Sequence, residues 1–162
     1  MSSSRWEALS GGSSGPAAHP TPPPHAGPLL GLGVDLLSLS RMQRLLARRP
    51  EFMFPLVDPE ERTYLEAEAS PEARLLVAAQ LWTGKEAVAK ALGTGVWQQG
   101  VAWHELGIRS SGEVILSGGA ARAVGPSILL WQGRRRGGHQ IAYAWRWRRR
   151  VAKTGEHAHA SS

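Results

Sequence analysis

The sequence contains no cysteine, which excludes disulfide bonds and thiolate metal sites and is compatible with a reducing compartment. No apolar run approaches the roughly 20 residues of a membrane-spanning helix, and the polar N-terminus lacks the apolar segment of a secretory signal. Signatures of a Walker loop, a serine triad and a zinc cluster are also missing. These absences predict a soluble, cytoplasmic protein with no membrane partner.

Acidic residues are missing from one part of the chain, so its formal net charge of +6 is unevenly distributed. Residues 29 to 132 hold ten Lys and Arg against eleven Asp and Glu, whereas residues 133 to 153 hold eight basic residues and no acid. A nucleic-acid binder that uses Arg134 to Arg136 and Arg146 to Arg150 is therefore one hypothesis, with Trp145 and Trp147 as stacking surfaces. Against it, these basic groups lie outside the organised core, and charge runs are usually solvated.

Composition divides the chain into three segments. Residues 1–28 are rich in Ser, Gly, Pro and Ala, and they carry too little apolar surface to offset the entropy of ordering. We expect them to be a disordered extension, and residues 151–162 to be a disordered tail. Residues 29–150 are long enough for one domain.

The central segment mixes helical and strand patterns. A strand is expected at Leu29 to Val34, where the apolar run indicates burial. Ser38 or Ser40 caps the helix that follows, and Asp58 with Glu61 forms a capping box. The expected helices are at 38–49, 58–67, 71–92 and 118–124, and the further strands are at 101–108, 114–116, 128–131 and 139–147, with a basic loop at 132–138.

The helix expected at 71–92 carries one acidic residue on an apolar face. Glu86 follows Trp82 by four residues and Ala79 by seven, so it shares their stripe. Lys90 lies one turn further on, and Lys85 lies at the edge of the same face. Either Glu86 and Lys90 form an ordinary helix pair, or Glu86 binds a metal and a lysine binds phosphate.

Asp35 supplies a second candidate carboxylate at the end of the apolar strand. It is either a helix cap or turn residue, or one of the functional groups that open sheets present at their strand ends. Together with Glu86 it suits Mg²⁺, which prefers oxygen ligands and takes only one or two protein carboxylates. Nearby lysines then match the charge of the substrate phosphates.

Several stretches resemble the 4′-phosphopantetheinyl transferases, and the single-domain holo-acyl-carrier-protein synthase type is the most similar. The resemblance covers roughly residues 29 to 131. The stretches are G-V-D-L-L, F-P-L-V-D-P-E-E-R-T-Y-L, W-T-G-K-E-A-V-A-K-A-L-G-T-G, W-H-E-L-G-I and G-E-V-I-L-S-G-G-A-A. This resemblance implies an α+β fold, a single domain in which an antiparallel sheet packs against a long central helix.

The resemblance also implies a reaction. Such enzymes move the phosphopantetheine arm of coenzyme A to a carrier-protein serine with Mg²⁺ and release adenosine 3′,5′-bisphosphate. The family's metal ligands fall on Asp35 and Glu86, and its phosphate-contacting lysine falls on Lys90, so these three are the implied catalytic residues. The general base is Glu86 or a metal-held water. The residues implied to bind the coenzyme are Lys85, Lys90, Gly93, Thr94 and Gly95.

The implied partners are an acidic acyl or peptidyl carrier protein and further copies of the chain, because this type works as a homotrimer. The arginines implied to dock the carrier are Arg41, Arg44 and Arg48. The buried faces of Trp103, Trp145 and Trp147 are either a subunit interface or ordinary core.

The chain departs from the family at a late strand. Members commonly carry an S-x-S-H stretch there, whereas the matching place holds Trp131 or Gln132, and His139 or the Arg134 to Arg136 loop is the candidate substitute. The alternative function is a non-catalytic or weakly active relative that binds coenzyme A or a carrier.

Overall fold

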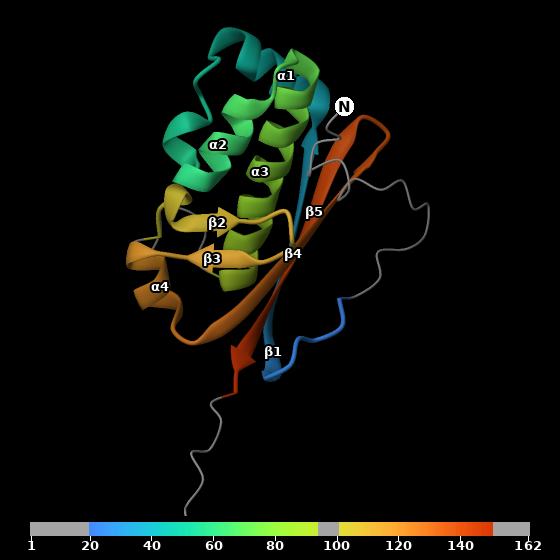
Figure 1. The fold of residues 1–162 in the computed structure, drawn as a ribbon. Coiled ribbons are helices and arrows are strands. Elements are labelled where there is room, and N and C mark those ends of the chain that lie inside the picture. The colour runs from blue at the N-terminus through green and yellow to red at the C-terminus, as the bar shows by residue number, and fades with distance from the viewer. Residues whose placement is uncertain (1–19, 94–100, 151–162) are drawn as a thin grey trace, which may run out of the picture.

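The computed structural model describes residues 20–93 and 101–150. Two antiparallel sheets are present in this part of the chain: three strands in the order β1-β5-β4, and the pair β2-β3 (Figure 1). The elements in chain order are β1 (Ala26–Ser38), α1 (Leu39–Arg48), η2 (Phe54–Leu56), α2 (Pro59–Ala67), α3 (Pro71–Leu92), η3 (Trp103–Glu105), β2 (Leu106–Ile108), β3 (Val114–Leu116), α4 (Gly118–Val124), β4 (Ser127–Arg136) and β5 (His139–Arg149).

Helix α3 lies across one face of the three-stranded sheet, as the α+β expectation required (Figure 1). Two glycines of β1 permit this close approach. A Cβ atom at Gly31 would overlap the carbonyl oxygen of Ala91, and one at Gly33 would overlap that of Ala87. Strand backbone therefore lies directly against helix backbone, which fixes the position of β1 along α3.

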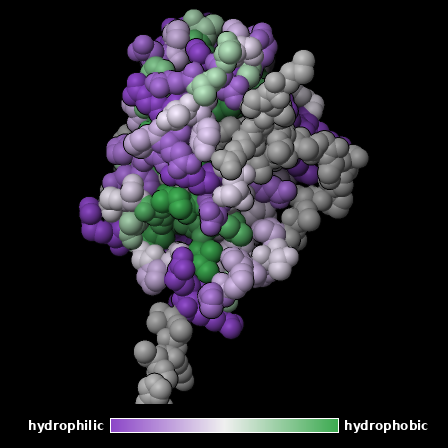
Figure 2. All heavy atoms as spheres, in the orientation of Figure 1, coloured by the Kyte–Doolittle hydropathy of each residue, from purple (hydrophilic) through white to green (hydrophobic). Residues whose placement is uncertain are grey.

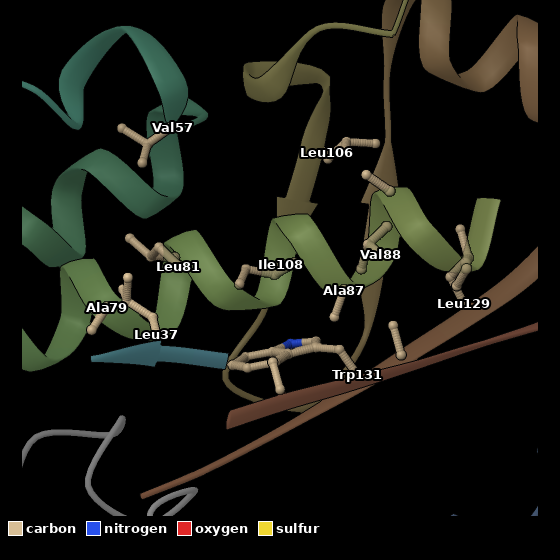
Figure 3. Close-up of a cluster of buried hydrophobic side chains, with 14 of the residues drawn as sticks. Leu37, Val57, Ala79, Leu81, Ala87, Val88, Leu106, Ile108, Leu129 and Trp131 are labelled. Carbon is tan, nitrogen blue, oxygen red and sulfur yellow. The ribbon is translucent and has the colours of Figure 1, made fainter. Parts of the chain in front are cut away.

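The core fills the space on both sides of α3. Ala87 and Trp131 lie between α3 and the three-stranded sheet, while Leu106 and Ile108 cover the helix from β2 (Figure 3). The helix is buried over most of its length. Its small residues permit close packing, because a Cβ atom at position 84 would overlap the Ile108 side chain.

The helix boundaries expected from the sequence are confirmed. Ser38 caps α1, Asp58 and Glu61 form a reciprocal capping box at α2, and α3 covers the expected residues 71 to 92. Gly93 ends α3 with φ 76°, in the left-handed region that glycine tolerates best. Among the described residues, no helix is long and apolar enough to cross a membrane.

Strand β1 differs from the expected short buried strand. It begins at Ala26, so three residues assigned to the N-terminal extension belong to the sheet, and Asp35 lies within the strand rather than at its end. Leu37 is buried, but the other large apolar side chains of β1 are 42% to 60% exposed, because β1 is an edge strand and α3 covers only the glycine-bearing face. The exposed residues are Leu29, Leu30, Leu32, Val34 and Leu36.

Two further expectations were wrong. The region expected as a strand at 101–108 contains the 3-10 turn η3 before β2, because Glu105 accepts a hydrogen bond from the backbone N–H of Ala102. The expected basic loop at 132–138 is largely strand: β4 continues to Arg136, and only Gly137 and Gly138 form the turn. Both glycines have positive φ, as a tight hairpin turn requires.

A buried ion pair links α2 to α3. The Nζ atom of Lys85 lies 2.7 Å from Oε2 of Glu61, and both side chains are fully buried. Glu61 also accepts hydrogen bonds from the backbone N–H groups of Asp58 and Ile108. Burial raises the pKa of Glu61 and lowers the pKa of Lys85, and their mutual attraction opposes both shifts.

We predict that Lys85→Met lowers the free energy of unfolding by about 3–5 kcal/mol, because the Glu61 carboxylate stays buried without its partner. Urea denaturation measures the effect. The control is Arg62→Ala, which removes an exposed i, i+4 pair with Glu66 and should cost less than about 1 kcal/mol. Equal losses in the two variants would contradict the role assigned to the buried pair.

Candidate functional site

Three of the predicted site residues converge where β1 crosses α3. The Lys90 Nζ atom donates to Oδ1 of Asp35 at 2.8 Å and to the carbonyl oxygen of Val34 at 3.0 Å. Asp35 follows Gly33 by two residues and so shares the face of β1 that packs on α3. Glu86 lies one turn before Lys90 on the same helix. The glycine contacts thus bring together groups that are some fifty residues apart in the sequence.

The electrostatics of this cluster favour a bound cation. Burial raises the pKa of Glu86, repulsion from Asp35 raises it further, and Lys90 lowers it. The two carboxylates are therefore close enough to repel each other. The Asp35 side chain is 16% exposed and that of Lys90 is 50% exposed, so the cluster is open to solvent on one side.

The donor set fits Mg²⁺. Only oxygen donors converge here, and two carboxylates are as many as Mg²⁺ usually takes from a protein. In the described ranges, no group of three or more His, Cys, Asp or Glu side chains could hold a metal. The arrangement thus suits a hard ion that keeps waters or phosphate oxygens as its other ligands, rather than a zinc site.

Lys85 does not join the cluster. Its side chain is buried in the pair with Glu61 and also donates to the carbonyl oxygens of Trp103 and Leu106. The expectation that Lys85 contacts the coenzyme is therefore corrected, because its ammonium group has no exposed surface in this structure. The role of Glu61 was missed: the capping box identified its backbone position but gave no sign of a partner on α3.

The end of α3 lies exposed. Gly93 has open space around its Cα, so its backbone is accessible from solvent. The other two members of the predicted coenzyme-binding turn, Thr94 and Gly95, lie outside the described residues.

Neither substitute for the missing histidine faces the acidic cluster. His139 pairs with Ser38 and alternates with Gln140 and Ala142, whose side chains are buried on the α3 side, so His139 belongs to the other face of the sheet. Arg134 lies over the Tyr143 ring on that other face and donates to its hydroxyl at 2.8 Å. Among the described residues of one chain, the cluster therefore consists of Asp35, Glu86 and Lys90.

Helix α1 presents the three predicted docking arginines to solvent. Arg41, Arg44 and Arg48 are exposed, while Met42 is buried against the core. The other exposed features differ in character: on the face in Figure 2, apolar side chains gather over β2 and β3, where Ile115 is 47% exposed.

A groove of about 340 Å³ runs between α1 and the start of α3. It does not adjoin the acidic cluster, because the last α3 residue in its lining, Leu75, precedes Glu86 by three turns of helix. We therefore do not assign the coenzyme to it. Its lining residues are Gln43, Leu46, Ala47, Pro50, Ala69, Pro71, Glu72, Arg74 and Leu75.

Comparison with known proteins agrees with this geometry. The family model of the 4′-phosphopantetheinyl transferase superfamily matches residues 31–160. A holo-[acyl-carrier-protein] synthase of Shouchella clausii is 34% identical over 84 residues, which are 52% of this chain and 70% of that protein.

Solved structures share the fold. The holo-[acyl-carrier-protein] synthase of Neisseria meningitidis is 23% identical and superposes with a TM-score of 0.63, covering 74% of this chain and 98% of the other. A holo-(acyl-carrier-protein) synthase of Bacillus anthracis in complex with CoA (3′,5′-ADP) is 22% identical with a TM-score of 0.58, covering 74% and 97%. Because the family model matches most of the chain and the Shouchella protein is 34% identical to it, the chain belongs to the 4′-phosphopantetheinyl transferase superfamily.

Proposed function

We propose that this chain is a holo-acyl-carrier-protein synthase. It transfers the 4′-phosphopantetheine arm of coenzyme A to a serine of an acyl or peptidyl carrier protein and releases adenosine 3′,5′-bisphosphate. The observation that carries the proposal is the meeting of Asp35, Glu86 and Lys90 at the crossing of β1 and α3. The relative named as a holo-[acyl-carrier-protein] synthase supports it. We place the reaction in the cytoplasm.

Asp35 and Glu86 are the residues that would hold Mg²⁺. The chemistry that the ion would supply there is neutralisation of the negative charge that develops during phosphoryl transfer. Lys90 serves as the counter-ion of Asp35 in the chain alone. Its ammonium group is half exposed, so it would be free to contact a coenzyme phosphate, and the accessible backbone at Gly93 would contribute to the same binding site.

The bond changes are those of a phosphoryl transfer. The carrier's serine oxygen attacks the phosphorus that bears the pantetheine arm, and a new P–O bond forms. The P–O bond to the bridging oxygen of the pyrophosphate breaks, and adenosine 3′,5′-bisphosphate leaves with that oxygen. Glu86 is the chain's own acceptor for the serine proton, because its carboxylate belongs to the cluster at the crossing of β1 and α3.

The exposed arginines Arg41, Arg44 and Arg48 of α1 bind the acidic carrier. Like charges side by side on a helix surface are unfavourable in the free protein, and an acidic partner relieves their repulsion. The groove beside α1, which includes Leu46 and Leu75, offers apolar surface for the same partner.

The assembly we propose is a homotrimer built through the open face of the three-stranded sheet. Leu32, Val34 and Leu36 are exposed there, beside Tyr143 and Ile141 of β5. A continuous apolar sheet face on an edge strand is an association surface. Trp103 does not contribute to it, because its ring packs inside the protein 4.7 Å from that of Trp82.

The second candidate is a relative that binds coenzyme A or a carrier without efficient transfer. The absence of His139 and Arg134 from the face of Asp35 favours it. The carrier's mass after incubation with coenzyme A and Mg²⁺ separates the two, since only transfer adds the phosphopantetheine arm.

We expect Asp35→Asn and Glu86→Gln each to lower the rate of transfer on the order of 100-fold. Each variant removes one of the two carboxylate charges that would hold Mg²⁺ where negative charge develops during the reaction. The measurement is carrier mass gain against Mg²⁺ concentration. Glu113→Gln, at an exposed acid of the β2–β3 turn, is the matched control and should transfer normally. Full activity in either site variant would rule out the metal assignment.

We expect Arg44→Glu to raise the KM for the carrier about tenfold and to leave the KM for coenzyme A unchanged, since an exposed interface charge acts mainly on encounter with the charged partner. Steady-state transfer assays with each substrate varied in turn provide the test. An equal change in both constants would contradict docking on α1.

We expect the double variant Leu32→Glu with Leu36→Glu to be monomeric in sedimentation equilibrium, where the parent chain is trimeric. Charges on this face would be buried in the interface without partners. Ile115→Glu is the control, because Ile115 is similarly exposed but lies on β3. A parent chain that sediments as a monomer would refute the assembly.

A further inference from the structure

The tip of the β4–β5 hairpin lies against the start of α1. The backbone N–H of Leu39 donates to the carbonyl oxygen of Gly138 at 3.0 Å, and Ser38 pairs with His139. Both elements stand at the same end of the molecule (Figure 1). The last residues of β4 and the first turn of α1 thus form one continuous surface.

Positive charge accumulates on this surface, although positive side chains do not stabilise the N-terminal end of α1. The N-terminus of a helix carries a partial positive charge and favours acidic side chains. The first turn of α1 has none and holds Arg41 instead, while the adjoining hairpin contributes the exposed Arg135 and Arg136. Residues 36–50 and 114–150 contain no Asp or Glu at all. Where a sequence breaks a local rule in this way, a function is the usual reason.

The two sides of the hairpin differ. Arg134 lies on the face away from α3, where Tyr143 holds it. Arg135 alternates with it and follows Gly133, which is buried on the α3 side. Arg135, which pairs with Gln140, therefore lies on the side of the sheet that carries the helices, next to the N-terminal end of α1. Arg136 pairs with His139 and shares the face of Arg134.

We propose that Arg135 extends the arginine row of α1 into one docking surface for an acidic helix of the carrier protein. Arg41 to Arg48 spans about 10 Å along α1, and the hairpin tip lengthens the row at its N-terminal end. This inference rests on the proposed function, since it names a further part of the carrier surface.

A nucleic acid fits this surface less well. The remaining basic cluster, Arg148 and Arg149, lies at the opposite end of β5, about 30 Å away at ten residues of strand. Between the two clusters, Arg146 donates to the carbonyl oxygens of Leu92 and Val124 and is not available to a ligand. Trp145 is buried, so it offers no stacking surface.

The test compares two single charge reversals on the same hairpin. In Arg135→Glu we expect binding of a purified apo acyl carrier protein, measured by titration calorimetry, to weaken about tenfold, with coenzyme A binding unchanged. Arg148→Glu, with the same charge change at the far end of β5, should bind the carrier normally. Circular dichroism of each variant verifies the fold.

Calorimetry without turnover separates this inference from the proposed function. If carrier binding depends on the hairpin but the chain transfers nothing, the docking surface is supported and the proposed transferase activity is refuted. Normal transfer with unchanged carrier binding in Arg135→Glu would overturn the docking surface alone. Unchanged carrier binding together with lost retention of a single-stranded oligonucleotide would assign the hairpin to nucleic acid instead.

Discussion

The site depends on how closely β1 approaches α3. Helix and strand backbones touch at Gly31 and Gly33, where any side chain would overlap helix carbonyl oxygens. This contact leaves no freedom for β1 to slide along the helix, so Asp35 meets Lys90 and Glu86. The positions of these three side chains thus follow from one strand packed on one helix, and rigid elements hold functional groups better than loops do.

The two lysines of the K-E-A-V-A-K stretch show how similar side chains on one helix acquire different roles. Lys90 lies on the exposed side of α3 and neutralises an acid that belongs to the site. Lys85 lies on the buried side, where Glu61 and two backbone carbonyl groups satisfy its ammonium group. A buried pair of this kind stabilises little in net terms, yet removing one member is costly, so it constrains how α2 can sit on α3.

Local signals made the helices predictable from the sequence. Ser38, Asp58 and Gly93 mark helix ends through short-range chemistry, and the structure keeps all three in these roles. The pairing of Glu61 with Lys85 was not predictable, because their separation in sequence carries no periodic signal. The predicted strand lengths were wrong for a related reason. Strands β1 and β4 extend further than their apolar runs because β5 pairs with both of them. Asp35, Glu86 and Lys90 were identified by their chemistry, but only the fold brings them together.

Residues of β1 alternate between the two faces of the sheet, and each face has its own role. Gly31, Gly33 and Asp35 lie on the face toward α3, whereas the side chains of Leu32, Val34 and Leu36 point to the open side. A single inserted or deleted residue between 31 and 37 would exchange these two sets, placing leucines against the helix backbone and the carboxylate among apolar neighbours. The irregular pairing with β5 lies before Gly31. Length variation is therefore tolerable upstream of that glycine, whereas between Gly31 and Leu37 the length of the strand is fixed by the packing of both its faces.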